Sequence, residues 1–320
     1  MNVFGDTLVT ATGNSDYPDA ANQPPYVMRN SATVMLPSGR IRSAVPNARL
    51  LAGHSLIDVP ARDQLPGGRN FYWPTSLTTA VDPVSGKEVI LLFLAQMFDP
   101  NLAADGRRDV AWTFAQVSSR LAAYSLAPDG RLTLLSLTRT PMPALTRDGI
   151  GWGAGTFVTS GCLYVFGSRR PTDVPMAWGS DYYLARVPLA SRSTLAAWRF
   201  CTGAGWATKP SRAAVVIPYT CGVESTIAAR RDPITREFTF VFKEFAIIGS
   251  RVLRGRSTLP TGPWIIDPTP VAEIAPFDAT DMSYSAHEVP LGGGGVGTII
   301  SHGNLAPSTP TERLGIFALT

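Results

Sequence analysis

The chain has 320 residues, of which 45% are hydrophobic and 16% charged, with a formal net charge of +4. This apolar content is enough for a large core and excludes a disordered chain. Lysine and arginine are scattered along the sequence, so we expect no nucleic-acid partner, and no apolar run is long enough to predict a membrane span. The 29 glycines and 27 prolines are spread throughout, which indicates short strands and turns in a single domain over residues 1–320.

Two predicted strands open the chain. Asn2–Val9 follows Met1 directly, and Ser31–Leu36 comes after a polar stretch. No signal peptide precedes the first strand. We therefore expect a cytoplasmic protein if the chain starts at Met1, and a secreted or cell-envelope protein if an export signal lies upstream.

Four predicted hairpins follow. Each joins a strand of small and β-branched residues, through a turn of Gly, Pro or Asp, to a more hydrophobic strand. Their second strands start roughly 60 to 75 residues apart, a spacing typical of repeated sheets. The paired segments are Thr78–Val81 with Val89–Phe93, Gly155–Val158 with Cys162–Phe166, Thr226–Ala229 with Phe238–Phe242, and Ser285–Val289 with Val296–Ile300.

Further strand-like runs lie after the hairpins. They are Ala111–Val117, Leu132–Leu137, Tyr182–Val187, Leu195–Phe200, Ser250–Arg254, Trp264–Ile266 and Arg313–Leu319. Four strands per unit at this period predict an all-β fold, a five-bladed β-propeller. Helices should be few, because no segment combines a long 3.6-residue apolar period with caps.

The first blade is expected to be incomplete. Asn2–Val9 matches the second strand of a blade, and the innermost strand is missing, while Arg313–Leu319 is a third strand with no fourth after it. We expect the native protein to begin upstream of Met1, because an open blade leaves backbone groups unpaired. The alternative is a naturally shortened propeller that closes with an exposed gap.

The residues that could carry chemistry are few. The three cysteines lack metal-binding spacing, so they are either three free thiols or one bridge, with Cys201–Cys221 as the favoured pair, and a spare thiol. With three histidines and no phosphate-binding loop, we expect no metal and no cofactor. Among hydrolytic chemistries, these absences favour carboxylates acting in pairs.

A propeller binds ligands at one mouth of its channel, where the innermost strands begin. Trp73, Trp152, Tyr284 and His287 lie at such starts and are candidate substrate-binding residues, because flat rings suit the faces of sugars. Glu224 is a candidate catalytic carboxylate on an otherwise apolar strand.

Each of these candidates has an alternative role. The two tryptophans could pack between blades, and Glu224 could be a structural carboxylate paired with Arg254. His287 could be a core histidine, since it alternates with Glu288 and only one of the two can face the channel.

The sequence also resembles a known family. Phe4-Gly-Asp-Thr7 with Met28-Arg-Asn-Ser-Ala32 is similar to the start of DUF4185 bacterial propellers, and Tyr183–Leu189, Trp198, Gly203 to Trp206 and Glu224-Ser-Thr also fit that group. That family is similar to endo-D-arabinanases of mycobacterial cell walls, which use two aspartates. The resemblance implies a catalytic role for Asp6 and substrate binding at Asn30, and it places the other aspartate before Met1.

A glycosidase site at Asp6 is chemically reasonable. Cleavage of a furanoside passes through an oxocarbenium-like state, which needs one carboxyl group to protonate the leaving oxygen and a second to stabilise or attack the anomeric carbon, or to activate water. Gly5 would let a ligand approach the backbone. The alternative is that Asp6 caps a local turn.

Three functions therefore stay open. The first is an endo-acting D-arabinan hydrolase that works as a monomer on a polysaccharide. The second is a non-catalytic glycan-binding propeller, and the third is a hydrolase of the same architecture that acts on another sugar.

Overall fold

A computed structural model gives the fold of this chain. It describes residues 56–100, 114–141, 149–171, 179–232, 234–246, 249–274 and Ala286 with their side chains. It describes the backbone alone in the strands at 2–4, 7–9, 26–28, 31–35, 41–43, 281–290, 296–304 and 313–318.

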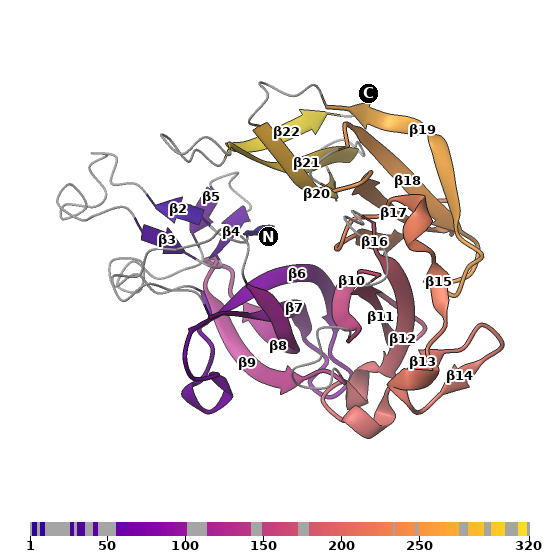
Figure 1. Cartoon of the computed structure of the whole chain (residues 1–320). Coiled ribbons are helices and arrows are strands. Elements are labelled where there is room, and N and C mark those ends of the chain that lie inside the picture. Colours follow the sequence, from indigo (N-terminus) through magenta and orange to yellow (C-terminus); the bar gives the residue numbers. More distant parts are fainter. Residues whose placement is uncertain are drawn as a thin grey trace.

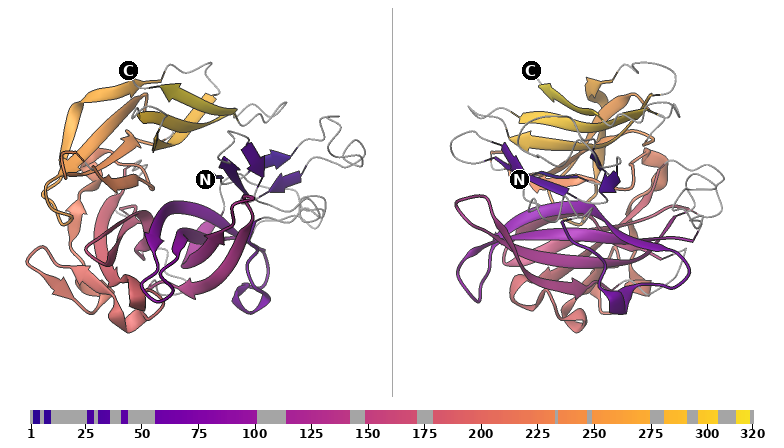
Figure 2. Two further views of the ribbon diagram at one scale, coloured as in Figure 1. Left: turned by 180° about the vertical axis from the view of Figure 1, so that it is seen from behind. Right: turned by 90° about the vertical axis from the view of Figure 1, so that its left-hand side faces the viewer.

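The described residues form an all-β structure whose helices are short 3-10 turns. The sheets follow one another around the molecule in chain order (Figure 1). Seen from behind and from the side, the N-terminal strands lie between the sheet β6–β9 and the sheet β20–β22 (Figure 2).

The first two sheets are small. One has the order β1 (Asn2–Phe4), β4 (Ser31–Met35), β5 (Ile41–Ser43), and the other pairs β2 (Thr7–Val9) with β3 (Tyr26–Met28). The next sheet contains β6 (Arg69–Val81), β7 (Glu88–Asp99), β8 (Ala115–Leu126) and β9 (Leu132–Arg139).

The remaining sheets follow the same antiparallel order. The fourth sheet contains β10 (Gly151–Thr159), β11 (Cys162–Arg169), β12 (Asp181–Pro188), β13 (Arg199–Cys201) and β14 (Trp206–Ala207), and β15 (Val215–Ile217) pairs with β12. The fifth contains β16 (Ala228–Arg231), β17 (Phe238–Lys243), β18 (Arg251–Ser257) and β19 (Ile265–Glu273). The last contains β20 (Asp281–Pro290), β21 (Val296–Asn304) and β22 (Arg313–Ala318).

All four predicted hairpins are confirmed. They are β6–β7, β10–β11, β16–β17 and β20–β21, each antiparallel. Two of them turn on an aspartate: Asp82 accepts the Gly86 N–H, and Asp232 accepts the Arg236 N–H, through their main-chain oxygens. Gly86 and Arg236 both have positive φ, as a tight hairpin turn requires. The number of blades and the closure of the ring stay predictions.

Two predicted strands are wrong in part. Asn2–Val9 is not one strand, because β1 and β2 belong to different sheets. Leu195–Ala197 forms a 3-10 turn (η4), and the strand starts only at Arg199, where Phe200 pairs with Ala185 of β12. The two alanines of this turn have a low preference for β-strands, which explains why the strand does not start here. The turn ends at the buried Trp198, and the strand begins after it.

The cysteine alternatives are decided for the described thiols. Cys162, Cys201 and Cys221 are all free, which confirms the alternative of three free thiols over a Cys201–Cys221 bridge. Cys201 is buried, and the other two are partly buried.

The core lies between successive sheets. β7 is buried on both faces: Leu91 and Phe93 join a cluster with Leu163 and Val165 of the next sheet. Leu92 packs on the other face in a cluster with Ile57 and Val59. A strand covered on both sides reads as a continuous apolar run instead of an alternating one, as β7 does.

The innermost strands share an interruption near their starts. The pairing register shifts between Pro74 and Ser76 in β6, between Trp152 and Gly155 in β10, and between Tyr284 and His287 in β20. Neighbouring strands close two of these breaks, because the Ser76 hydroxyl donates to the Gly153 carbonyl at 2.7 Å and the Ile227 N–H donates to the Ala154 carbonyl at 2.7 Å.

Gly155 allows β10 and β16 to approach closely. A Cβ at Gly155 would lie 2.5 Å from Ile227 Cγ1 and 2.9 Å from the Ile227 carbonyl oxygen. Gly155→Ala should therefore lower the free energy of unfolding by about 2 kcal/mol through overpacking, measured by chemical denaturation. Gly205→Ala is the matched control, because nothing lies within 4 Å of its Cβ position. Equal stability of the two variants would contradict the close approach.

Candidate functional site

Glu224 occupies the break before β16, at the start of the sheet β16–β19. The isolated bridge between Val223 and Glu244 precedes it, and β16 begins only at Ala228. Its side chain is 2% exposed, and Oε1 accepts the N–H of Lys243 at 2.8 Å and the N–H of Ala286 at 3.2 Å. The Tyr182 hydroxyl donates to the main-chain carbonyl of Glu224. Glu224 thus joins three sheets, through β12, β17 and β20.

A buried amine lies beside this carboxylate. Lys243 is fully buried, and its ammonium donates to the Ala246 carbonyl in the turn after β17. Burial lowers the pKa of Lys243 to about 8, and the charge of Glu224 opposes part of that change. Burial also raises the pKa of the Tyr182 hydroxyl, and the Glu224 charge adds to it. The surroundings of Glu224 are therefore of low polarity.

Glu224 was weighed from sequence as either catalytic or structural. Its described hydrogen bonds come from main-chain amides of two other sheets. One amide lies at the end of β17, beyond its pairing with β16, and the other lies in the break of β20. By accepting both N–H groups, the carboxylate replaces the missing main-chain acceptors, which is a structural role. Glu224 is also an ionisable group at the end of the sheets where the innermost strands begin, which is the place predicted for a catalytic carboxylate.

The two tryptophans have different surroundings. Trp152 is 1% exposed and packs against Phe200, with ring centroids 5.2 Å apart. This burial agrees with packing between sheets, and the prediction that Trp152 binds substrate does not fit it. Trp73 is only partly buried and meets Phe71 and Phe114 edge-on, with centroids 5.5 and 4.6 Å apart. It stays a candidate sugar platform.

The other predicted residues lie at the limits of the described structure. Asp6 and Asn30 lie outside the described residues. Tyr284 and His287 lie in β20, paired with Ser301 and Ile299, and their side chains are not among those described. The break between them contains Ala286, whose N–H donates to Glu224. The backbone at Tyr284 and His287 thus flanks the contact with Glu224.

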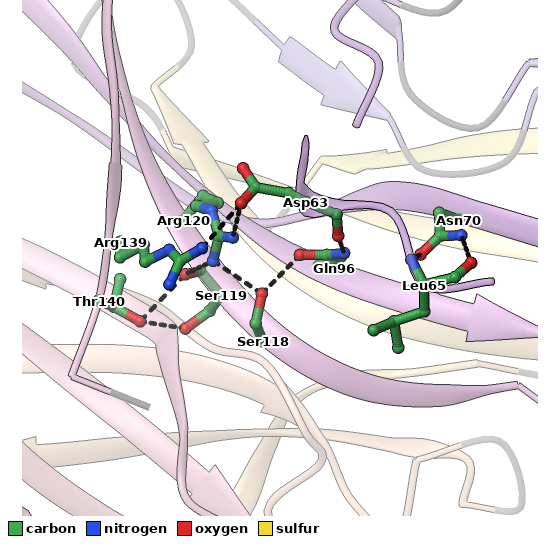
Figure 3. A network of polar contacts seen from close by, with 9 residues as sticks. All are labelled: Asp63, Leu65, Asn70, Gln96, Ser118, Ser119, Arg120, Arg139 and Thr140. Atoms are coloured by element: carbon green, nitrogen blue, oxygen red, sulfur yellow. Dashed lines mark hydrogen bonds and ion pairs between the residues drawn. The ribbon is translucent and has the colours of Figure 1, made fainter. Parts of the chain in front are cut away.

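A second cluster of charges was not predicted from sequence. Asp63, in the 3-10 turn Ala61–Asp63, lies across the face of β6–β9, where its Oδ1 is 3.3 Å from Arg120 Nη2 and 2.9 Å from Arg139 Nη2. Gln96 donates to the Asp63 carbonyl and accepts from Ser118 (Figure 3). No local pattern links Asp63 to arginines so far along the chain, so this pairing could not be predicted from the sequence.

The ionisation of the cluster follows from these contacts. Burial opposes ionisation of Asp63, but the Arg139 hydrogen bond and the charges of Arg120 and Arg139 hold its pKa below the ordinary value. Burial raises the pKa of Tyr72, on the same face, to about 12 against the opposing charge of Arg120. Asp63 is held as an anion by two arginines, which suits it to fixing the connector onto the sheet.

Lys243 was also missed, although the sequence contained a signal. It follows the apolar run Phe238–Phe242 without a turn, and lysine occurs only three times in the chain. A lysine that continues a buried strand needs a partner, because an unpaired buried charge is costly.

Together, the described residues define an all-β protein with a buried carboxylate at the starts of its inner strands. A model of the family "Domain of unknown function (DUF5005)" matches residues 19–284, and the chain belongs to this family. The resemblance to the DUF4185 group stays a prediction. A comparison with curated proteins finds no match. Among the described residues, no helix is both long and apolar enough to span a membrane.

The chain is also similar to solved structures at low identity. An α-L-arabinofuranosidase from Lactobacillus brevis is 13% identical, with 94% of this chain and 79% of that one covered and a TM-score of 0.45. An α-L-arabinanase from Cellvibrio cellulosa is 11% identical, with 99% and 92% covered and a TM-score of 0.45. A family 117 glycoside hydrolase from Zobellia galactanivorans is 11% identical, with 79% and 75% covered and a TM-score of 0.39. None of these three TM-scores reaches 0.5, so these likenesses assign neither an activity nor a substrate to this chain.

Asp63→Asn should be far more harmful than Arg139→Ala. Asn keeps the shape of Asp63 but leaves the buried Arg120 without its counter-charge, which should cost about 3 kcal/mol of unfolding free energy. Arg139 has a side chain that is 69% exposed, so its removal should cost about 1 kcal/mol or less. Urea denaturation measures both, and similar losses would contradict the assignment of Arg120 as the buried partner.

Lys243 should make stability depend on pH. The unfolded chain holds the proton up to the ordinary pKa of 10.5, whereas the folded chain releases it at about 8. The unfolded state binds more protons between these values, so the wild type should gain stability as pH rises through them. Relative to Lys243→Met, the gain from about pH 7.5 to about pH 10 should be on the order of 2 kcal/mol.

Denaturation at the two pH values measures this gain. Lys209→Met, which removes an exposed lysine, controls for the loss of one positive charge. Parallel pH profiles of the wild type and Lys243→Met would contradict the pKa change.

Proposed function

We propose that this chain is a glycoside hydrolase that cuts internal linkages of D-arabinan, with a five-bladed propeller as its scaffold. The observation that carries the proposal is the position of Glu224, a buried carboxylate in the break before β16, bonded to β17 and β20. Catalytic carboxylates are typically found where burial and fixed hydrogen bonds set their ionisation, and this position meets both conditions.

The chemistry requires a second carboxyl group. In the proposal, Asp6 supplies it, as the Gly-Asp-Thr motif implies, and one of the two groups protonates the leaving oxygen while the other acts at the anomeric carbon or on water. β1, which ends at Phe4 two residues before Asp6, lies beside β6. β1 therefore lies beside an innermost strand, which supports a contribution of the N-terminal segment to the same site.

Substrate contacts fall to the remaining candidates. Trp73 has an open part of its ring held edge-on by Phe71 and Phe114, which suits contact with the apolar face of a sugar. Asn30, Tyr284 and His287 complete the proposed binding set. Trp152 is left out of it, because its ring is enclosed in the core.

A non-catalytic glycan-binding propeller is the second candidate. It is favoured by one observation, the two main-chain N–H bonds that converge on Glu224 Oε1. A carboxylate that accepts these two bonds stabilises the contact between sheets, and this structural role does not require catalysis. A hydrolase of the same architecture that acts on another sugar is the third.

Asp6→Asn should lower the release of oligosaccharides from arabinogalactan about 100-fold or more, because the amide cannot exchange the proton or act as a nucleophile. The melting temperature should stay nearly unchanged, since Asn keeps the shape. Product analysis by chromatography measures the release. Full activity of this variant would remove Asp6 from the mechanism.

Glu224→Gln, compared in the same assay, separates the two roles of Glu224. Loss of activity with a retained fold supports catalysis, and a change in stability alone returns the residue to a structural role. For the wild type, retention on arabinogalactan without release would favour the glycan-binding propeller. No release from arabinan, with release from a polymer of another sugar, would favour the third candidate.

A further inference from the structure

The turn after β17 has an unusual backbone. Phe245 has φ of 51° and Ala246 has φ of 50°, so two consecutive residues with side chains adopt the left-handed region. Such residues are rare outside glycine and persist only where surrounding contacts hold them, often at functional sites. The turn lies at the end of the sheet where the innermost strands begin, because β17 runs antiparallel to β16.

Several contacts hold this turn in place. The Lys243 ammonium donates to the Ala246 carbonyl, and the Phe245 N–H donates to the Gly222 carbonyl at 2.7 Å. Arg251 binds Glu244 with two hydrogen bonds, from Nε to Oε2 at 2.8 Å and from Nη2 to Oε1 at 2.6 Å. A paired guanidinium and carboxylate of this kind fixes both orientation and distance. The described part of the turn is therefore clamped at both ends.

The side chain of Phe245 is exposed although its neighbours are not. Phe238, Phe240 and Phe242 are buried in the strand before it, whereas Phe245 is 40% exposed. A single exposed apolar residue is ordinary on a protein surface. Here, however, the ring is exposed by a turn whose backbone is in an unfavourable conformation, and the buried Lys243 holds that turn through its hydrogen bond to Ala246.

The exposed ring lies on the segment that carries the candidate carboxylate. A Cβ at Gly222 would lie 2.9 Å from Phe245 Cε1, so the ring covers the Gly222 backbone, two residues before Glu224. Val223, between them, is bridged to Glu244 of the turn. The phenyl ring is thus exposed over the buried segment from Gly222 to Glu224, and the Glu224 carboxylate accepts the N–H of Lys243, two residues before Phe245.

We infer that Phe245 is a binding platform for a sugar ring of the polysaccharide, next to Glu224, and that Lys243 is the positioning residue that holds the platform. The inference rests on the proposed function, since it takes a furanose polymer as the ligand. A phenyl face supplies apolar contact to the C–H face of a sugar ring at little entropic cost, because the clamped turn is already ordered.

Affinity electrophoresis in gels that contain purified arabinogalactan tests the inference. Phe245→Ala should weaken the apparent affinity about ten-fold, because the variant loses the apolar area that one face of the ring would bury against the sugar. Phe245→Trp should keep or increase the affinity. Leu259→Ala is the matched control, because Leu259 is 56% exposed and follows β18, at the opposite end of the sheet from the turn. Thermal melting of each variant checks that the fold is retained.

The outcomes separate this inference from the proposed function. Equal retention of wild type and Phe245→Ala would overturn the platform and leave the hydrolase proposal standing. Weaker retention of Phe245→Ala, with no oligosaccharide released by the wild type, would support the platform and overturn hydrolysis. A wild type that arabinogalactan does not retain would overturn the platform, and release of oligosaccharides in that case would still support the hydrolase.

Discussion

The hydrogen bonds on the Glu224 carboxylate are the contacts on which the rest of the site depends. Main-chain ladders fail at this point, because β16 has not begun and β20 is interrupted between Tyr284 and His287. One carboxylate oxygen replaces the missing ladder acceptors for Lys243 and Ala286. Hydrogen bonds to a charged group are worth about 1.5–3 kcal/mol, and a buried N–H left unpaired would cost a similar amount. The sheets of β17 and β20 are thereby held in one relative position.

The same principle operates at the other breaks. Ser76 bonds to Gly153, and Ile227 bonds to Ala154, so an interruption in one innermost strand is closed by a group from the next. Because each break depends on its neighbour, the geometry at this end of the sheets is a collective property. Bulges of this kind re-aim side chains and commonly lie beside functional sites. Residues presented here are held by several sheets at once.

A buried carboxylate, a buried amine and an exposed phenyl ring therefore meet within one short stretch of structure. Lys243 connects them, since its N–H binds Glu224 and its ammonium binds the turn that presents Phe245. The cluster around Asp63 has a different task, because its anion is neutralised by two arginines and its contacts fix the connector before β6. The first group carries the proposed ligand site, and the second fixes the connector to its sheet.

The sequence by itself determined the local features of this protein. The hairpins at Asp82 and Asp232 were predictable because turn chemistry and apolar strands act within a few residues. Glu224 was also recognisable, as an acid in an otherwise apolar segment, although the structure places it before β16 and not on a strand. The tertiary structure alone decided the partners: Trp152 is buried because Phe200, from a strand that begins 40 residues after β10 ends, covers it. Asp63 meets Arg139 across 76 positions of sequence. Such pairings depend on how the strands of a sheet and the connector before β6 lie against one another in the folded chain, and no local period or spacing encodes which residues then come together.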